Sequence, residues 1–232
     1  MNNEEKATEA FRILNSCNIH YSNGKICEFT QEQKKYYESL LNDLERKQIS
    51  KANSTKDKGA ALENLVNYLL QCSGDIFEVY NDVRTNTNEI DQIIKLKPKG
   101  KILRNLGVLD ERYDEFICEC KNYKNRVGVT YVGKFCSLMN SCNVKFGVLF
   151  SYCGVTGTGW KDSSGLIKKI YMKSKVNENP TTIIDFNIED FKSISDGNNF
   201  LDIIENKIMK LKYDTNFEAL IQPHPAENLL KM

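Results

Sequence analysis

The chain has 232 residues, of which 41% are hydrophobic and 27% are charged, and its formal net charge is +1. This length allows one sizeable domain, the composition is that of a soluble globular protein, and the near-zero charge lacks the strongly basic signature of many nucleic-acid-binding proteins. No apolar run approaches the roughly 20 residues that span a bilayer, and the acidic start lacks the layout of a secretory signal, so we expect a cytoplasmic protein without membrane contact.

Helical spacing dominates the beginning of the chain. A short helix is expected over residues 4–15, and apolar residues recur at helical intervals over 31–50. A strongly amphipathic helix is expected over 59–70, with Gly74 suited to its C-terminal cap. We therefore expect residues 1–54 to form an N-terminal helical extension.

Strands and helices alternate in the rest of the chain. Expected strands cover residues 76–80, 89–95, 115–122, 145–152 and 182–186, and expected helices cover 130–142, 163–175, 188–194 and 200–211. Residues 96–115 look like an insertion or a long hairpin of unassigned role. This order predicts an α/β domain over residues 55–213, a mixed β-sheet flanked by helices on both faces, followed by a tail over 214–232.

The stretch FICECKNYKN, residues 116–125, raises a question of burial. Alternate side chains of a strand share one face, so Glu119 and Lys121 point one way while the phenylalanine and the two cysteines point the other. The face with the phenylalanine and the cysteines is suited to packing. The face with Glu119 and Lys121, by contrast, places a carboxylate and an ammonium group side by side.

Asp91 raises the same question in the preceding apolar strand. A buried carboxylate is costly without a charged or metal partner, and two on neighbouring strands repel each other unless a cation lies between them. Mg²⁺ takes oxygen ligands and is typically held by one or two carboxylates plus substrate phosphate. We predict that Asp91 and Glu119 bind Mg²⁺, with Mn²⁺ able to substitute. Lys121 would orient or help deprotonate an attacking water and stabilise negative charge on phosphorus.

These residues also resemble a family motif. Asp91 followed by Glu119-Cys120-Lys121 looks like the PD-(D/E)xK nuclease motif, whose acid and Glu-x-Lys lie on adjacent strands. Lys58-Gly59 leading to Glu63 is similar to the helix-borne Gly-x-x-x-Glu of Mrr-type restriction endonuclease domains. The resemblance implies a restriction-endonuclease-like fold, Mg²⁺-dependent cleavage of phosphodiester bonds, and a catalytic contact of Glu63 with the metal or its water.

The resemblance covers roughly residues 55–190 and has two departures. Ile90 stands where the motif has proline, which carries no chemistry. The family's polar helix position after the lysine, often glutamine, has only Thr130 or Tyr131 near it.

Basic residues form two clusters. The first consists of Lys95, Lys97, Lys99, Lys101 and Arg104, and the second of Lys121, Lys124, Arg126 and Lys134. A solvated surface explains the first as well as a phosphate contact does. The second adjoins the strand that carries Glu119, so we expect it to bind nucleic acid.

Other conspicuous residues have simpler interpretations. The eight cysteines lack the Cys-x-x-Cys spacing of zinc sites and are expected to be small buried hydrophobes. The only histidines, His20 and His224, lie near opposite ends of the chain, which argues against a histidine base in the core. Trp160 is expected to pack a turn. For Tyr123 and Tyr131, half-buried packing and the lining of a nucleic-acid groove both stay open.

We therefore expect a Mg²⁺-dependent endonuclease that hydrolyses DNA phosphodiester bonds in restriction or anti-phage defence. Cutting both strands usually needs two sites, so a homodimer is expected, and a defence-system subunit is a further candidate partner. Two alternatives stay open. One is a catalytically inactive nuclease-fold module that binds nucleic acid or a partner, and the other is a junction resolvase or repair nuclease.

Overall fold

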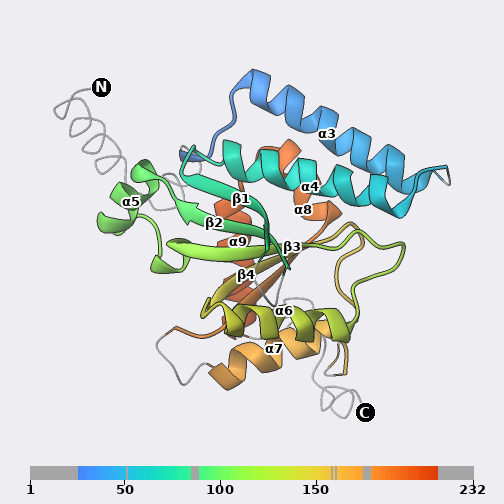
Figure 1. The fold of residues 1–232 in the computed structure, drawn as a ribbon. Coiled ribbons are helices and arrows are strands. Elements are labelled where there is room, and N and C mark those ends of the chain that lie inside the picture. The colour runs from blue at the N-terminus through green and yellow to red at the C-terminus, as the bar shows by residue number, and fades with distance from the viewer. Residues whose placement is uncertain are drawn as a thin grey trace, which may run out of the picture.

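A computed structural model describes residues 26–50, 52–84, 89–157, 159, 161–174 and 179–213 (Figure 1). The expected helix over 4–15, the tail over 214–232 and Trp160 lie outside the described residues. Among the described residues, no helix is both long enough and apolar enough to cross a membrane.

A mixed five-stranded sheet forms the centre of the fold, in the order β1-β2-β3-β4-β5. The strands are β1 (Phe77–Arg84), β2 (Glu89–Leu96), β3 (Glu115–Cys120), β4 (Phe146–Phe150) and β5 (Thr182–Phe186). The first three pair antiparallel, whereas β3, β4 and β5 run parallel. The predicted mixed sheet is confirmed. β1 is longer than expected because it pairs with β2 along its whole length.

Helices cover both faces of this sheet (Figure 1). On one face lie α3 (Gln31–Ile49), α4 (Thr55–Cys72), α8 (Ile188–Ser195) and α9 (Phe200–Tyr213); on the other lie α6 (Val129–Ser141) and α7 (Ser163–Ser174). α4 begins four residues before the predicted start. The cause is a capping box, in which Ser54 and Asp57 satisfy each other's backbone N–H groups.

The alternation of β3 divides its side chains between two apolar cores. Phe116, Cys118 and Cys120 belong to the larger core, under α3, α4, α8 and α9. Ile117 belongs to the smaller core, with residues of α6 and α7. The cysteines of β3 are therefore packing residues with free thiols, as predicted.

The segment between β2 and β3, which was expected to be an insertion or a long hairpin, connects two antiparallel neighbours and is largely helical. It contains α5 (Pro98–Asn105) and a short 3₁₀ helix, η1 (Glu111–Tyr113). Most cations of the first basic cluster are occupied here by local partners: Lys95 pairs with Glu115, Lys97 with Asp75, and Arg104 with Glu111 and Asp114, while Lys99 donates to the Gly74 carbonyl. These contacts favour the structural interpretation of that cluster.

Candidate active site

The antiparallel ladder between β2 and β3 ends at Asp91. Paired residues run from Lys95↔Glu115 to Gln92↔Cys118, and one further step would place Asp91 opposite Glu119. Instead, the Asp91 Oδ2 atom accepts a hydrogen bond from the backbone N–H of Cys120 at 2.8 Å. The carboxylate thus replaces the missing ladder partner, and this bond fixes it beside the end of β3.

Lys121 places its ammonium group between the two predicted carboxylates. The Lys121 Nζ atom lies 2.5 Å from Glu119 Oε1 and 3.5 Å from Asp91 Oδ2. Its backbone N–H donates to the carbonyl of Phe150 at 2.8 Å, which continues the parallel pairing with β4. The structure therefore brings Asp91, Glu119 and Lys121 together on one face of the sheet.

Burial and neighbouring charges shift the pKa values of both Glu119 and Lys121 upward. Burial raises the pKa of Glu119, the charge of Asp91 raises it further, and Lys121 counteracts part of the increase. Burial alone would lower the pKa of Lys121, but the two carboxylates outweigh it and raise that pKa above its usual value. The two carboxylates thus stabilise the protonated form of Lys121.

The donor set suits a hard divalent cation. Glu119 Oε2 is buried and has no hydrogen-bond partner among the described residues, so one carboxylate oxygen lacks the partner that burial requires. Two carboxylates on one face supply the oxygen ligands that Mg²⁺ prefers. Within the described ranges, however, no group of three or more His, Cys, Asp or Glu side chains could hold a metal ion.

Glu63 stands apart from the pair. It lies on the exposed side of α4, and its Oε1 atom is directed toward Gly59, where an added Cβ would lie 3.9 Å away. Partial burial of its carboxylate raises the pKa of Glu63, as does the charge of Asp91. The predicted third acid is thus within electrostatic range of Asp91 without joining it in a three-carboxylate cluster.

Hydrogen bonds from two helices hold the loop that follows β3. The buried Asn122 side chain donates to the Lys58 carbonyl at 2.7 Å, and Lys58 Nζ donates to the Gln48 carbonyl at 3.1 Å. Gln48 Nε2 in turn donates to the Tyr123 carbonyl at 3.3 Å. Sequence reasoning missed Gln48 and Asn122, because no local pattern links the end of α3 to a loop that far along the chain.

A further acid, Asp185, lies in register with Glu119 two strands away. Glu119 pairs with Leu149 and Leu149 with Asp185, so all three side chains point to one face. Burial raises the pKa of Asp185, and its Oδ1 atom has no hydrogen-bond partner among the described residues. Sequence reasoning missed Asp185, although an acid inside an apolar strand is the signal that identified Asp91.

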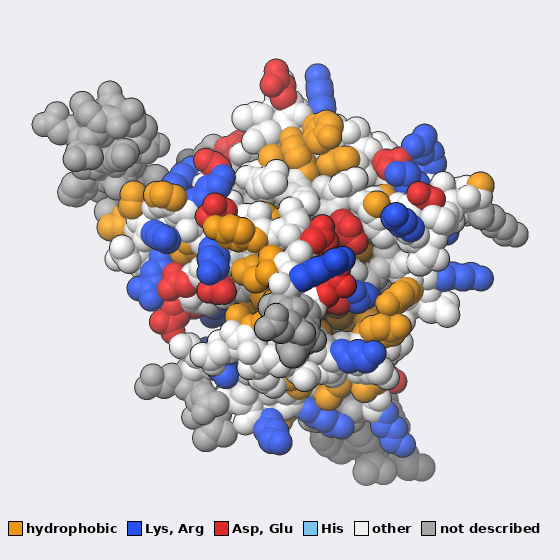
Figure 2. Space-filling view, viewed as in Figure 1, with side chains coloured by type: hydrophobic (Ala, Val, Ile, Leu, Met, Phe, Trp, Pro, Cys, Tyr) orange, Lys and Arg blue, Asp and Glu red, His pale blue; other side chains and the backbone are white. Residues whose placement is uncertain are grey.

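The second basic cluster is largely free of acidic partners. Among the described residues, no carboxylate lies within ion-pair distance of Lys124, Arg126 or Lys134. Figure 2 shows acidic and basic side chains gathered near the middle of the face where Figure 1 shows the end of β3. A pocket of about 420 Å³ lies between this end of β3 and α6; its lining includes Glu119, Lys121, Tyr131, Lys134, Phe135 and Leu149.

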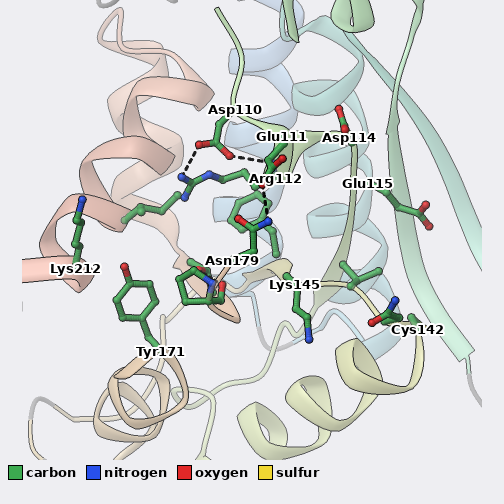
Figure 3. Close-up of a pocket in the computed structure, with 16 residues that line it drawn as sticks. Asp110, Glu111, Arg112, Asp114, Glu115, Cys142, Lys145, Tyr171, Asn179 and Lys212 are labelled. Atoms are coloured by element: carbon green, nitrogen blue, oxygen red, sulfur yellow. Dashed lines mark hydrogen bonds and ion pairs between the residues drawn. The ribbon is translucent and has the colours of Figure 1, made fainter. Parts of the chain in front are cut away.

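A larger pocket, of about 830 Å³, lies at the opposite end of the strands, where β3, β4 and β5 begin (Figure 3). Its acids already have partners: Asp110 binds Arg112 at 2.8 Å, and Glu111 accepts from Asn179 at 2.5 Å. Figure 3 shows the Arg112 guanidinium turned toward Asp110. This pocket has no pair of carboxylates on adjacent strands, so the candidate active site is the one at Lys121.

Comparison with known proteins assigns the family. The model of the Mrr catalytic domain, described as restriction endonuclease, matches residues 54–171, which is just over half of the chain. No curated protein and no solved structure matches the chain. The matched segment contains Glu63, Asp91, Glu119 and Lys121, and the fold agrees with the restriction-endonuclease-like architecture that the sequence motif implied. The chain therefore belongs to the restriction endonuclease family and carries its Mrr-type nuclease domain.

Proposed function

We propose that this protein is a Mg²⁺-dependent endonuclease that hydrolyses DNA phosphodiester bonds. The observation that carries the proposal is the convergence of Asp91 and Glu119, from adjacent strands, on the single ammonium group of Lys121. A purely structural ion pair would need one acid. Two acids on one partly buried face suit a site that also accepts a metal ion, since one carboxylate oxygen has no hydrogen-bond partner among the described residues.

Each residue has a distinct role in this proposal. Asp91 and Glu119 supply carboxylate oxygens to Mg²⁺, which would lower the pKa of a bound water and polarise the phosphate. Lys121 places its ammonium group between these two side chains, where it would orient or help deprotonate the attacking water and stabilise negative charge on phosphorus. For Glu63 we propose a contact with a metal-bound water, because it lies outside the immediate pair.

DNA is the proposed substrate because three cations near the site have no acidic partner among the described residues. Lys124 and Arg126 follow β3, and Lys134 lies on α6 beside the pocket. Uncompensated lysines and arginines bind phosphates through charge and counterion release. We further propose a homodimer, since double-strand cleavage needs two sites, and a role in restriction or anti-phage defence.

Plasmid cleavage tests the proposal. Supercoiled plasmid is incubated with Mg²⁺ and wild type, Asp91→Asn or Lys121→Ala; asparagine keeps an oxygen for the N–H of Cys120. We expect the wild type to nick or linearise the plasmid and each variant to lose roughly 100-fold or more in rate. Lys97→Ala, which breaks an ion pair on α5's side of the sheet, is the control and should cut normally. Equal cleavage by all four proteins would show that the site is assigned wrongly.

A non-catalytic nucleic-acid-binding module is the second candidate. The 2.5 Å contact between Lys121 and Glu119 favours it, because the ammonium group already neutralises that carboxylate without a metal. Calorimetric titration distinguishes the two functions. Uptake of Mg²⁺ or Mn²⁺ that Glu119→Gln abolishes supports the nuclease, and no uptake by the wild type supports the binding module.

A further inference from the structure

The pocket beside Lys121 has the composition of a site for a small flat ligand. Its charged lining consists of Glu89, Glu119, Lys121 and Lys134, and the rest includes the aromatic Tyr131 and the apolar side chains of Phe135 and Leu149. Its volume of about 420 Å³ falls within the range of small-molecule sites. A surface that only follows a DNA backbone needs no such hollow.

An aromatic pair borders this pocket. The rings of Tyr123 and Tyr131 lie 5.0 Å apart between centroids and are tilted by 42°. Tyr123 is partly buried, and this burial together with its hydrogen bond to Tyr131 raises the pKa of Tyr123 to about 12. Tyr131 keeps 38% of its surface exposed although it belongs to the pair. A ring that is held in place and still accessible costs little entropy when it stacks on a ligand.

A positive charge accompanies the exposed ring. Lys134 Nζ lies 5.8 Å from the centroid of Tyr131, and no carboxylate among the described residues lies within ion-pair distance of it. A cation–π contact at an exposed site is weak, so Lys134 can exchange it for a phosphate at little cost. Ring and cation together match the base and the phosphate of one nucleotide.

We propose that this pocket binds an unpaired nucleotide next to the cleaved phosphate, with its base stacked on Tyr131 and its phosphate near Lys134. A paired base cannot enter the hollow without leaving the duplex, which costs a few kcal/mol, whereas a bulged or single-stranded base pays least. The inference rests on the proposed function, since it places the nucleotide beside Lys121. It adds that the preferred substrate is DNA with an unpaired nucleotide rather than a continuous duplex.

Binding without metal tests the preference separately from cleavage. In EDTA, fluorescence anisotropy measures the Kd of wild type for two duplexes that differ only in a single bulged nucleotide. We expect about tenfold tighter binding of the bulged duplex, as one stacked base provides. Tyr131→Ala and Tyr131→Leu should bring the ratio of the two Kd values close to one, and Tyr131→Phe should preserve it.

Tyr213→Ala is the matched control. Tyr213 is also exposed and also has a lysine near its ring, with Lys212 Nζ 5.7 Å from the centroid, but it lies at the end of α9. This variant should keep the wild-type ratio. With 2-aminopurine at the bulge, wild type and Tyr131→Phe should quench its fluorescence by stacking, and Tyr131→Ala should not.

Two results would overturn the inference. One is equal affinity of the wild type for both duplexes, and the other is a Tyr131→Ala variant that weakens both by the same factor, as a packing role of the pair predicts. Failure of the proposed function has a different signature. In that case adding Mg²⁺ leaves both duplexes uncut, whatever their ratio of affinities.

Discussion

Two partly buried acids that face the same side of the sheet, Glu119 and Asp185, have different partners. Glu119 and Asp185 lie on either side of Leu149, and burial raises the pKa of each. Glu119 has the ammonium group of Lys121 as a counter-ion at 2.5 Å. Asp185 receives a long hydrogen bond from Asn187, and Lys207 counteracts only part of its pKa increase. The charged form of Asp185 therefore opposes folding, with no described ligand or catalytic role in return.

The Asp185→Asn variant tests this cost through its pH dependence. The native pKa of Asp185 is above its unfolded value, so its contribution to stability is present below about pH 4 and is lost as the pH rises through the native pKa. Asparagine imitates the protonated form. At pH 8 we expect the variant to exceed the wild type in free energy of unfolding by on the order of 1 kcal/mol, and to lose that advantage near pH 4. Urea denaturation at both pH values measures it, and a difference independent of pH would contradict it.

The residues of the candidate site differ in how far sequence alone reveals them. Asp91 and Glu119 are visible because a carboxylate in an apolar strand needs a partner, and the strand period puts Lys121 on the same face. Asp185 satisfies the same criterion, so the criterion detects buried acids and does not separate ligands from bystanders. The pairing of the strands makes that distinction. It brings Asp91 beside β3, whereas Leu149 separates Asp185 from Glu119.

At the scale of elements, α3 is part of the nuclease fold in its packing. Tyr37, Leu41 and Leu44 contribute to the larger core, and the buried Tyr37 hydroxyl donates to the Phe191 carbonyl at 2.9 Å. Gln48 reaches the loop after β3. The predicted boundary at residue 54 remains a prediction, and these contacts favour cooperative unfolding of α3 with the sheet.

Two substitutions in α3 test whether it unfolds with the domain. Leu44 is fully buried, so Leu44→Ala should lower the free energy of unfolding by about 2–5 kcal/mol. Ile49 is 80% exposed, and Ile49→Ala should change it by less than about 0.5 kcal/mol. Urea denaturation followed by circular dichroism measures both. Similar small effects would mean that α3 detaches before the rest unfolds.

The described element types follow from sequence periodicity, except between β2 and β3. Pro98 and Gly100 lie in the segment expected to be an insertion or a long hairpin, and each has a helical role. Pro98 occupies the first turn of α5, where its missing N–H costs nothing. At Gly100, an added Cβ would lie 2.7 Å from the carbonyl oxygen of Ile76, the residue before β1. Glycine therefore allows α5 to pack closely against the start of β1. Such tertiary reasons for a residue are invisible in a local pattern.

Over the whole molecule, the distribution of charge matters more than its sum. The net charge is +1, and most of the first basic cluster is neutralised by neighbouring acids. Lys124, Arg126 and Lys134, the other cations of the second cluster, have no such partners among the described residues. Attraction for a polyanion is therefore concentrated near the end of β3, beside Lys121.

The salt dependence of DNA binding tests this distribution. Each of Lys124→Gln and Arg126→Gln should reduce the slope of log K against log salt concentration by about one, because each removes one phosphate contact. Lys97→Gln should leave the slope unchanged, since Asp75 already occupies that lysine. Filter binding at several NaCl concentrations provides the slopes. An equal reduction by Lys97→Gln would mean that the whole surface attracts DNA without preference.

The segment that contains α5 leaves the sheet where β2 ends and returns where β3 begins, on the left of the view in Figure 1. Asp91 and Lys121 lie at the other extremity of the same two strands. Leu103 and Tyr113 anchor this segment in the larger core, at a strand's length from the reactive groups. A substitution in this segment is thus expected to weaken the fold without displacing the carboxylates or the lysine of the candidate site.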